Sequence, residues 1–173
     1  MIIFLKSVLI IIIIFGCSYL GYLKSISFIK REKILKDFDI FFNRIKNEIC
    51  YMQTTVPNLI ENNRQDLDIE IKNALGAIST DMLITNSLFQ IEKSIEKNID
   101  KIKNLNSMDK NYIIKGLNGL GKTDEKGQES LICNTVKFID MQIEEASNLK
   151  NKNAKLYKNL GFLFGMFVVI IFI

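Results

Sequence analysis

The strongest constraint on this chain is the apolar run at its N-terminal end. From Ile2 to Leu23 the sequence reads IIFLKSVLIIIIIFGCSYLGYL, interrupted by Lys6 and Ser7 near its start. In helical form, about 20 apolar residues cross a hydrocarbon core of roughly 30 Å. A lysine near one end of such a helix can extend to the interface. We therefore expect residues 1–23 to form an uncleaved transmembrane helix.

Two other interpretations of this run are a cleaved signal peptide and a lipoprotein signal. A signal peptide carries an A-x-A-like cleavage site, and none follows the run. A lipoprotein signal would use Cys17, but the bulky Phe15 stands beside Gly16, and the chain stays apolar beyond the cysteine. The sequence favours the transmembrane helix over both.

A second apolar run closes the sequence, from Leu160 to Ile173. Its 14 residues reach only about 21 Å as a helix. Including Leu156–Tyr157, with Lys155 and Lys158 extended to the interface, brings the run near the lower limit of roughly 17 residues for a span. Local thinning of the bilayer would absorb the remaining mismatch. We expect residues 159–173 to form a C-terminal transmembrane segment, with a half-inserted anchor as the alternative.

Basic residues flank both runs on the sides that face each other in the sequence. Five lysines and arginines lie within residues 24–36, and four lysines lie within residues 150–158. By the positive-inside rule, the segment of residues 24–158 is cytoplasmic and both termini face outward. Anionic lipid beside each span explains these lysines more simply than nucleic acid does, so no nucleic-acid partner is expected.

The cytoplasmic segment carries two long apolar stripes. Their members recur every three or four residues, which is typical of amphipathic helices that bury one face. Each long helix continues into a membrane run, so we expect an antiparallel stalk with shorter helices closing a bundle at its far end. The expected fold class is all-α, a membrane-anchored antiparallel helical bundle. The stripes comprise Ile34, Phe38, Phe41, Ile45, Ile49 and Met52 in the first helix, and Ile132, Val136, Ile139, Ile143, Ala146 and Leu149 in the last.

Helix-breaking residues divide the region between the stripes. Residues 54–57 (TTVP) end the first long helix, and the proline of this stretch suits the first turn of the next helix. Polar residues within 62–68 predict a turn, and helices through Leu75 and Leu88 follow. Ser107 is the expected cap of a further helix.

Composition argues against several kinds of catalytic site. The chain has no His, which removes the commonest general base, serine-type triads and His-containing zinc sites. Cys17, Cys50 and Cys133 show neither metal-ligand spacing nor a disulfide framework, and we interpret them as buried small apolar residues. We expect no catalytic residues, no metal site and no cofactor.

One short pattern indicates a nucleotide hydrolase instead. Residues 116–123, GLNGLGKT, match the G-x-x-x-x-G-K-[ST] pattern of the phosphate-binding loop. That loop follows a strand and belongs to a parallel α/β sheet, whereas only residues 112–114 look strand-like and no βαβ alternation is present. The nearest candidate for an acidic magnesium ligand, Asp140, lies inside a long amphipathic helix. We therefore expect an interhelical turn rather than ATP or GTP hydrolysis.

Physical considerations give this glycine stretch another role. Gly121, together with Gly116 and Gly119, is expected to end one helix in a tight or left-handed turn. Asp124, or Thr123 before it, then caps the long returning helix. The turn is either purely structural or a docking surface at the membrane-distal tip.

The same loop resembles a known family. Residues 120–128, LGKTDEKGQ, are similar to the L-G-x-[ST]-D-x-x-x-Q loop of the stage III sporulation protein AB family. The matching positions are Leu120, Gly121, Asp124 and Gln128. Gln128 lies one helical turn beyond Asp124, on the same face, within reach of the loop.

A second segment resembles the same family. Glu48, Tyr51 and Thr54 in EICYMQT match the family's E-[IL]-x-Y-x-x-T pattern, although Thr55 and Val56 stand where Pro and Leu usually follow. We expect Tyr51 to pack across the bundle, with contact to a partner as the alternative. The C-terminal stretch of residues 157–161, YKNLG, also resembles the family's ending.

The resemblance implies a function. Members of this family are made in the mother cell of endospore-forming bacteria and belong to the channel, or feeding tube, that joins mother cell and forespore. Their cytoplasmic domain is similar to the platform protein of type II secretion. The chain would then be a non-enzymatic platform in the mother cell membrane around the forespore. Its partners would be a cytoplasmic secretion-type ATPase, membrane components of the channel and the lipid bilayer, with a homo-oligomer as a further candidate assembly. The alternatives are a two-span signalling or scaffold hairpin and, more remotely, a phosphate-binding-loop hydrolase.

Overall fold

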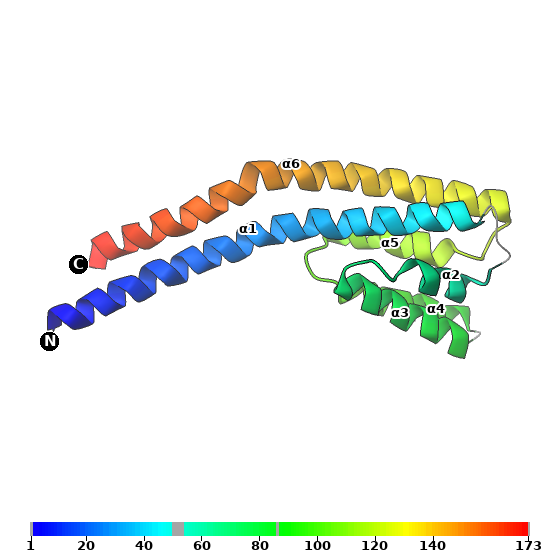
Figure 1. Cartoon of the computed structure of the whole chain (residues 1–173), viewed down its shortest axis with the longest axis horizontal. Helices are drawn as coiled ribbons and strands as arrows, with labels where there is room; N and C mark the ends of the chain where they lie inside the picture. The colour runs from blue at the N-terminus through cyan, green and yellow to red at the C-terminus, as the bar shows by residue number, and fades with distance from the viewer. Residues whose placement is uncertain (1, 50–53, 86, 173) are drawn as a thin grey trace. The chain divides into compact units, whose positions relative to one another are not determined.

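The structure of the chain is a computed structural model. It describes the backbone of residues 2–49, 54–85 and 87–172, and the side chains in these ranges except at positions 2–9, 11, 125, 171 and 172. Every element in the described ranges is an α-helix, which confirms the all-α class (Figure 1). The helices are α1 Ile2–Ile49, α2 Val56–Asn63, α3 Ile69–Ile84, α4 Leu88–Asp100, α5 Ser107–Gly119 and α6 Glu125–Phe172.

The chain divides into two compact units. We call Met1–Glu32 with Glu145–Ile173 the paired-helix unit, and Lys33–Glu144 the helical domain. Helices α1 and α6, each of 48 residues, contribute to both units. The boundaries predicted at residues 23 and 158 separate membrane segments from the cytoplasmic segment. They depend on the position of a bilayer, and they remain predictions.

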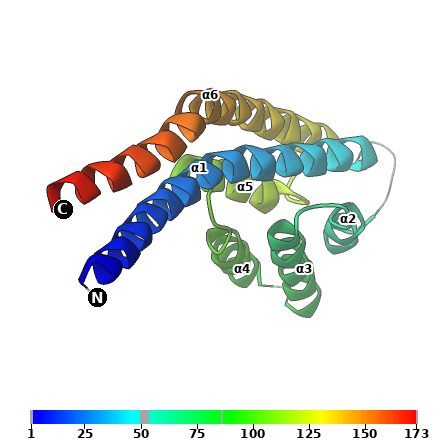
Figure 2. The same cartoon turned by 60° about the vertical axis from the view of Figure 1, so that its left-hand side comes forward.

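The helical domain buries one apolar core to which all six helices contribute. Helix α2 contacts α3, α3 contacts α4, and α4 contacts α5 (Figure 2). Residues of the first apolar stripe form the part of this core that α1 contributes. Within it, the rings of Phe41 and Phe42 meet edge to face at 5.3 Å. The core comprises Ile34, Phe38, Phe41, Phe42, Ile45, Leu59, Ile60, Leu67, Ile71, Ala74, Leu75, Ile78, Ile95, Ile99, Ile102, Ile113, Leu117, Leu120, Ile132 and Ile139.

Helix ends follow the sequence with two corrections. Pro57 lies in the first turn of α2, as predicted. Asn63 belongs to α2 and is buried rather than forming part of a turn. The cap of α5 is Asn106 rather than Ser107. The Asn106 side chain accepts from the Asp109 N–H at 2.7 Å, and the Asp109 carboxylate accepts from the Asn106 N–H at 2.9 Å, so two backbone donors are satisfied reciprocally.

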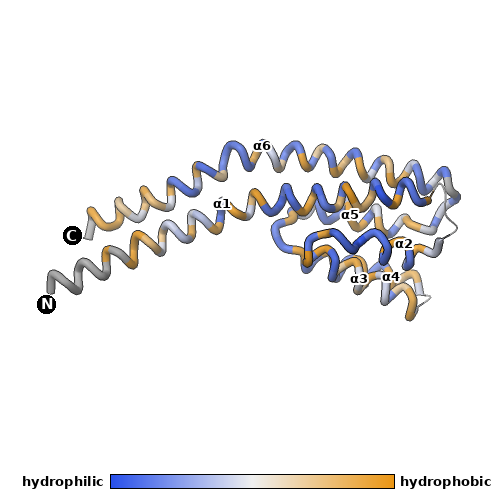
Figure 3. The backbone as a smooth tube through the Cα atoms, in the orientation of Figure 1, coloured by the Kyte–Doolittle hydropathy of each residue, from blue (hydrophilic) through white to orange (hydrophobic). Residues whose placement is uncertain are grey.

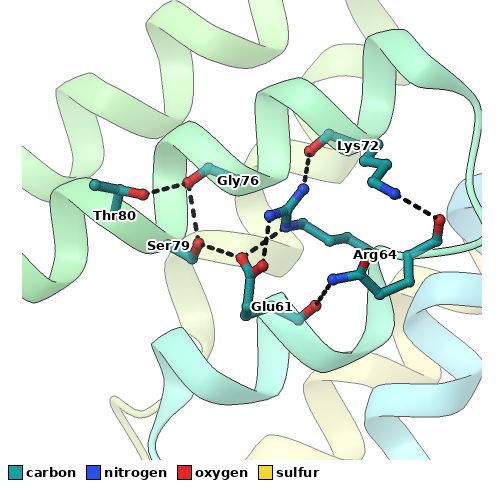
Figure 4. Close-up of polar contacts among 7 residues, drawn as sticks. Glu61, Arg64, Lys72, Gly76, Ser79 and Thr80 are labelled. Carbon is teal, nitrogen blue, oxygen red and sulfur yellow. Dashed lines mark hydrogen bonds and ion pairs between the residues drawn. The ribbon is translucent and has the colours of Figure 1, made fainter.

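A polar cluster joins α2 to α3 (Figure 4). The Arg64 guanidinium donates to the Glu61 carboxylate and, at 3.1 Å, to the carbonyl oxygen of Lys72. The Ser79 hydroxyl donates to the same carboxylate at 3.2 Å. Hydrogen bonding to Arg64 holds the pKa of Glu61 below its ordinary value. The cluster links the two helices beside the core.

In the paired-helix unit, α1 and α6 are antiparallel and approach closely at glycines. A Cβ added at Gly21 would lie 2.6 Å from the Tyr157 carbonyl oxygen and 2.9 Å from Gly161 Cα. A Cβ added at Gly165 would lie 3.1 Å from Ile14 Cα. The distances at Gly21 leave no room for a side chain, whereas those at Gly165 require its neighbours to shift by only a few tenths of an ångström. Small residues spaced by four are how membrane helices bring their backbones together.

Polar and aromatic contacts continue this pairing beyond the glycines. The rings of Phe28 and Tyr157 stack at 5.7 Å. Arg31 pairs with Glu145 at 3.0 Å. Lys150 pairs at 2.6 Å with Glu32, whose side chain is largely buried.

The apolar ends of α1 and α6 lie in the paired-helix unit (Figure 3). Among the described residues, one helix is long and apolar enough to cross a membrane, Ile12–Ile49 near the N-terminus. This finding agrees with an N-terminal membrane helix. The C-terminal span at residues 159–173 remains a prediction.

Candidate functional site

The 120–128 loop joins α5 to α6 through a compact set of hydrogen bonds. Gly121 has φ +74°, the left-handed conformation that glycine adopts without steric cost. Its N–H donates to the Gln128 side-chain oxygen at 3.2 Å, and the Gln128 amide donates to the Thr123 carbonyl at 2.9 Å. The hydrogen bonds to Gln128 agree with the reach predicted from the sequence.

Asp124 starts α6. Its carboxylate accepts from the Gly127 N–H at 3.1 Å, and its carbonyl accepts from the Gln128 N–H at 2.9 Å. This is the geometry of an N-cap, in which a side-chain oxygen satisfies a free donor of the first turn. Of the two expected caps, the structure selects Asp124.

We expect Asp124→Ala to lower the free energy of unfolding by about 1 kcal/mol, because the Gly127 N–H loses its acceptor. Urea denaturation of the purified chain in detergent measures this change. Asp124→Asn is the matched control, since its amide oxygen still accepts and stability stays near wild type. If Asp124→Ala keeps wild-type stability but stops sporulation, the residue docks a partner rather than capping a helix.

The phosphate-loop pattern has a structural explanation. Gly116 does not end α5 but lies inside it, where an added Cβ would be 2.7 Å from Thr135 Cγ2 and 2.9 Å from Phe42 Cζ. Residues 112–114, the strand-like stretch, are helical. Lys122, which would bind phosphate in such a loop, pairs with Glu92 of α4 at 2.6 Å. Gly116 therefore serves helix packing, and Lys122 links the loop to α4.

The loop borders a small apolar cleft in the helical domain. The cleft has a volume of 210 Å³ and is lined by residues of α2, α3, α4 and α5 together with the loop. Val56, Met82, Leu88 and Leu120 supply apolar walls. Asn118 also lines it, and its side-chain oxygen is buried without a hydrogen-bond partner among the described residues.

Beside the cleft, the turn between α3 and α4 exposes four large apolar side chains. Leu83, Ile84, Leu88 and Phe89 are exposed by 68%, 78%, 63% and 73% respectively. Contiguous exposed apolar residues on a soluble surface mark interaction sites. We call these four residues the α3–α4 patch, and Leu88 belongs to both the patch and the cleft.

Sequence reasoning missed the α3–α4 patch. Leu88 shows helical spacing with the buried Ile95 and Ile99, which suggested that its helix presents one packed face. The available signal was the two pairs of apolar residues on either side of the polar residues 85–87. Two such pairs flanking a short turn cannot all face one core.

The second predicted segment is only partly described. Glu48 is half-buried near the end of α1, and Thr54 is half-buried before α2. Tyr51 lies outside the described residues, so its predicted packing across the bundle remains a prediction. The structure does bring the loop and the start of α2 together, since a Cβ added at Gly121 would lie 2.9 Å from Val56 Cγ2.

Comparison with known proteins places the chain in a family. The family model described as stage III sporulation protein AB matches residues 6–173. A solved structure titled "Stage III sporulation protein AB (SpoIIIAB)" is similar over 71% of this chain and 98% of that chain, with a TM-score of 0.64 and 15% sequence identity, and at that identity it supports the fold alone. A search of curated proteins finds no match. Since the family model covers nearly the whole sequence, the chain belongs to the stage III sporulation protein AB family.

Proposed function

We propose that the chain is a non-enzymatic membrane platform of the channel between mother cell and forespore, which couples a cytoplasmic secretion-type ATPase to the channel's membrane components. Membership of the stage III sporulation protein AB family supports a role in sporulation. The candidate membrane helix near the N-terminus supports an integral membrane protein. In this proposal, the chain lies in the mother cell membrane around the forespore, with residues 24–158 in the cytoplasm and both termini outside.

The observation that carries the platform role is the α3–α4 patch with its adjoining cleft. Four exposed apolar side chains beside an open apolar cleft form a surface that a partner can desolvate. Binding energy at an interface is usually concentrated in a few residues. The buried, unpaired oxygen of Asn118 would accept a hydrogen bond from a partner group that enters the cleft, and this would remove the cost of an unsatisfied polar atom.

The ordered 120–128 loop would hold one wall of this surface. Leu120 is buried in the core and lines the cleft, and the hydrogen bonds of Gln128 fix the loop to the start of α6. The ion pair of Lys122 with Glu92 joins the loop to α4, from which Phe89 and Leu88 project. In this proposal the loop positions the docking surface, and the nucleotide site belongs to the ATPase partner.

The test is to place a charge in the α3–α4 patch. We expect Phe89→Asp and Ile84→Asp to abolish capture of the sporulation ATPase by the full-length chain and to block spore formation. The thermal unfolding midpoint should stay near wild type, because both side chains are exposed in the folded chain.

Met108→Asp is the matched control. Met108 is also a large exposed apolar residue, 59% exposed, but it lies at the start of α5. It should leave ATPase capture unchanged. Wild-type capture by both patch variants would overturn the docking surface, and equal loss in Met108→Asp would show that the effect is not specific to the patch.

A further inference from the structure

The paired-helix unit carries a second cavity that the platform role does not use. It is a groove of 660 Å³ between α1 and α6. Phe15, Tyr19 and Tyr22 line it from α1, and Lys158, Phe162 and Leu163 line it from α6. Both walls come from the apolar ends of their helices.

The lining changes in polarity along the groove. The helices are antiparallel, so Tyr22 and Lys158 lie toward one end and Phe15 and Leu163 toward the other. The distance from Tyr22 to Phe15 along α1 is about 10 Å at 1.5 Å per residue. Tyrosine and lysine are the side chains that occupy the membrane–water interface. The groove therefore runs from an interfacial end into apolar surroundings.

The polar end of the groove carries positive charge. Lys158 is exposed and forms no ion pair among the described residues. The acidic residues of this unit for which contacts are described, Glu32 and Glu145, are paired with Lys150 and Arg31 and lie at least ten positions from Tyr22 and Lys158 in their own helices. Among the described residues that line the groove, none is acidic. Its charge is therefore complementary to an anion.

We propose that this groove binds an anionic phospholipid, with the phosphate at Lys158 and Tyr22 and an acyl chain along Phe15, Phe162 and Leu163. The inference rests on the proposed membrane insertion of the unit. A lipid satisfies both ends of the groove at once, because its headgroup is charged and its chain is apolar. A transmembrane helix of a partner would have to present a carboxylate to Lys158 at the interface.

The experiment uses the full chain reconstituted in vesicles of phosphatidylglycerol and phosphatidylcholine. After mild detergent extraction, native mass spectrometry counts the lipids that each variant retains. Wild type should retain phosphatidylglycerol in preference to phosphatidylcholine. Lys158→Gln should reduce that preference about fivefold, which is the effect of one lysine near an anionic surface. Leu163→Trp, which fills the groove, should reduce retention of both lipids.

Lys152→Gln is the matched control, since Lys152 is an exposed lysine of α6 that does not line the groove. An equal loss of preference in Lys152→Gln, or no preference in wild type, would overturn the proposal. A photoreactive amino acid in place of Tyr19 should give lipid adducts. Adducts to a second copy of the chain instead would assign the groove to a helix of that copy and overturn the lipid site.

Alkaline extraction of membranes separates this result from the proposed function. If wild type is released by alkali, the membrane insertion itself is wrong. If wild type stays in the membrane but shows no lipid preference, only the groove assignment fails. Lys158→Gln should stay in the membrane while losing its lipid preference.

Discussion

Gly21→Ala is expected to separate α1 from α6 in the paired-helix unit. The added methyl carbon would lie 2.6 Å from the Tyr157 carbonyl oxygen and 2.9 Å from Gly161 Cα. Both are backbone atoms and cannot rotate away, so the helices must move apart. Overpacking of this kind costs about 1–3 kcal/mol, and the close backbone approach on which such pairing depends would be lost.

A disulfide reports on this pairing. A Cβ at position 165 would lie 3.3 Å from Cys17 Cβ, near the roughly 3.5–4.5 Å found in disulfides. The Gly165→Cys chain in vesicles should therefore cross-link to Cys17 when oxidised, and adding Gly21→Ala should lower the cross-linked fraction several-fold. Adding Cys17→Ser should abolish the cross-link and so verify its identity.

Gly16→Ala is the matched control for this prediction. Gly16 lies on the same helix, but an added Cβ there meets no atom within 4 Å. The cross-linked fraction should stay at the level of the Gly165→Cys chain, since alanine only improves the helix propensity by about 1 kcal/mol. Equal cross-linking in the Gly21→Ala and Gly16→Ala chains would show that the glycine contact does not hold the pair together.

Phe42→Ala is expected to produce the largest loss of stability in the helical domain. The ring is fully buried, meets Phe41 edge to face at 5.3 Å, and lies against Gly116 of α5. Truncation leaves a cavity where α1 and α5 meet, and Phe→Ala substitutions in cores cost about 3–5 kcal/mol. This is a large part of the roughly 5–15 kcal/mol that stabilises a typical domain.

Chemical denaturation of the full chain in nanodiscs, with hydrogen exchange of the core amides, measures this loss. Phe89→Ala is the control, because the Phe89 ring is 73% exposed and exposed positions usually change stability by less than about 0.5 kcal/mol. A Phe42→Ala chain as stable as the Phe89→Ala chain would mean that the α1–α5 contact does not support the core.

Phe42 and Phe89 are therefore expected to have different roles, one in stability and the other in docking, although both are phenylalanines. Loss of Phe42 should unfold the domain and take sporulation with it, whereas a charge at Phe89 should stop ATPase capture in a folded chain. A sporulation defect alone does not separate these roles. Measuring unfolding and ATPase capture on the same variants does, since only the core variant should change both.

Much of the loop could be predicted from the sequence, because its determinants are local. The left-handed Gly121, the Asp124 cap and the reach of Gln128 each depend on residues within one or two turns. The role of Gly116 was not predictable in this way. Its neighbours Phe42 and Thr135 come from helices distant in the sequence. Their close approach explains why position 116 is a glycine, whereas the phosphate-loop pattern suggested a role in nucleotide binding.

The helical class, the buried faces of α1 and α6 within the helical domain, and the apolar ends of the chain all follow from the sequence alone. Hydrophobic periodicity and helix caps are short-range properties, so a single chain displays them. The contact between Gly21 and Gly161 and the exposure of the α3–α4 patch depend instead on how distant segments pack. Whether an apolar residue is buried depends on which distant segment covers it: Ile95 is fully buried in the core, whereas nothing in the described chain covers Phe89.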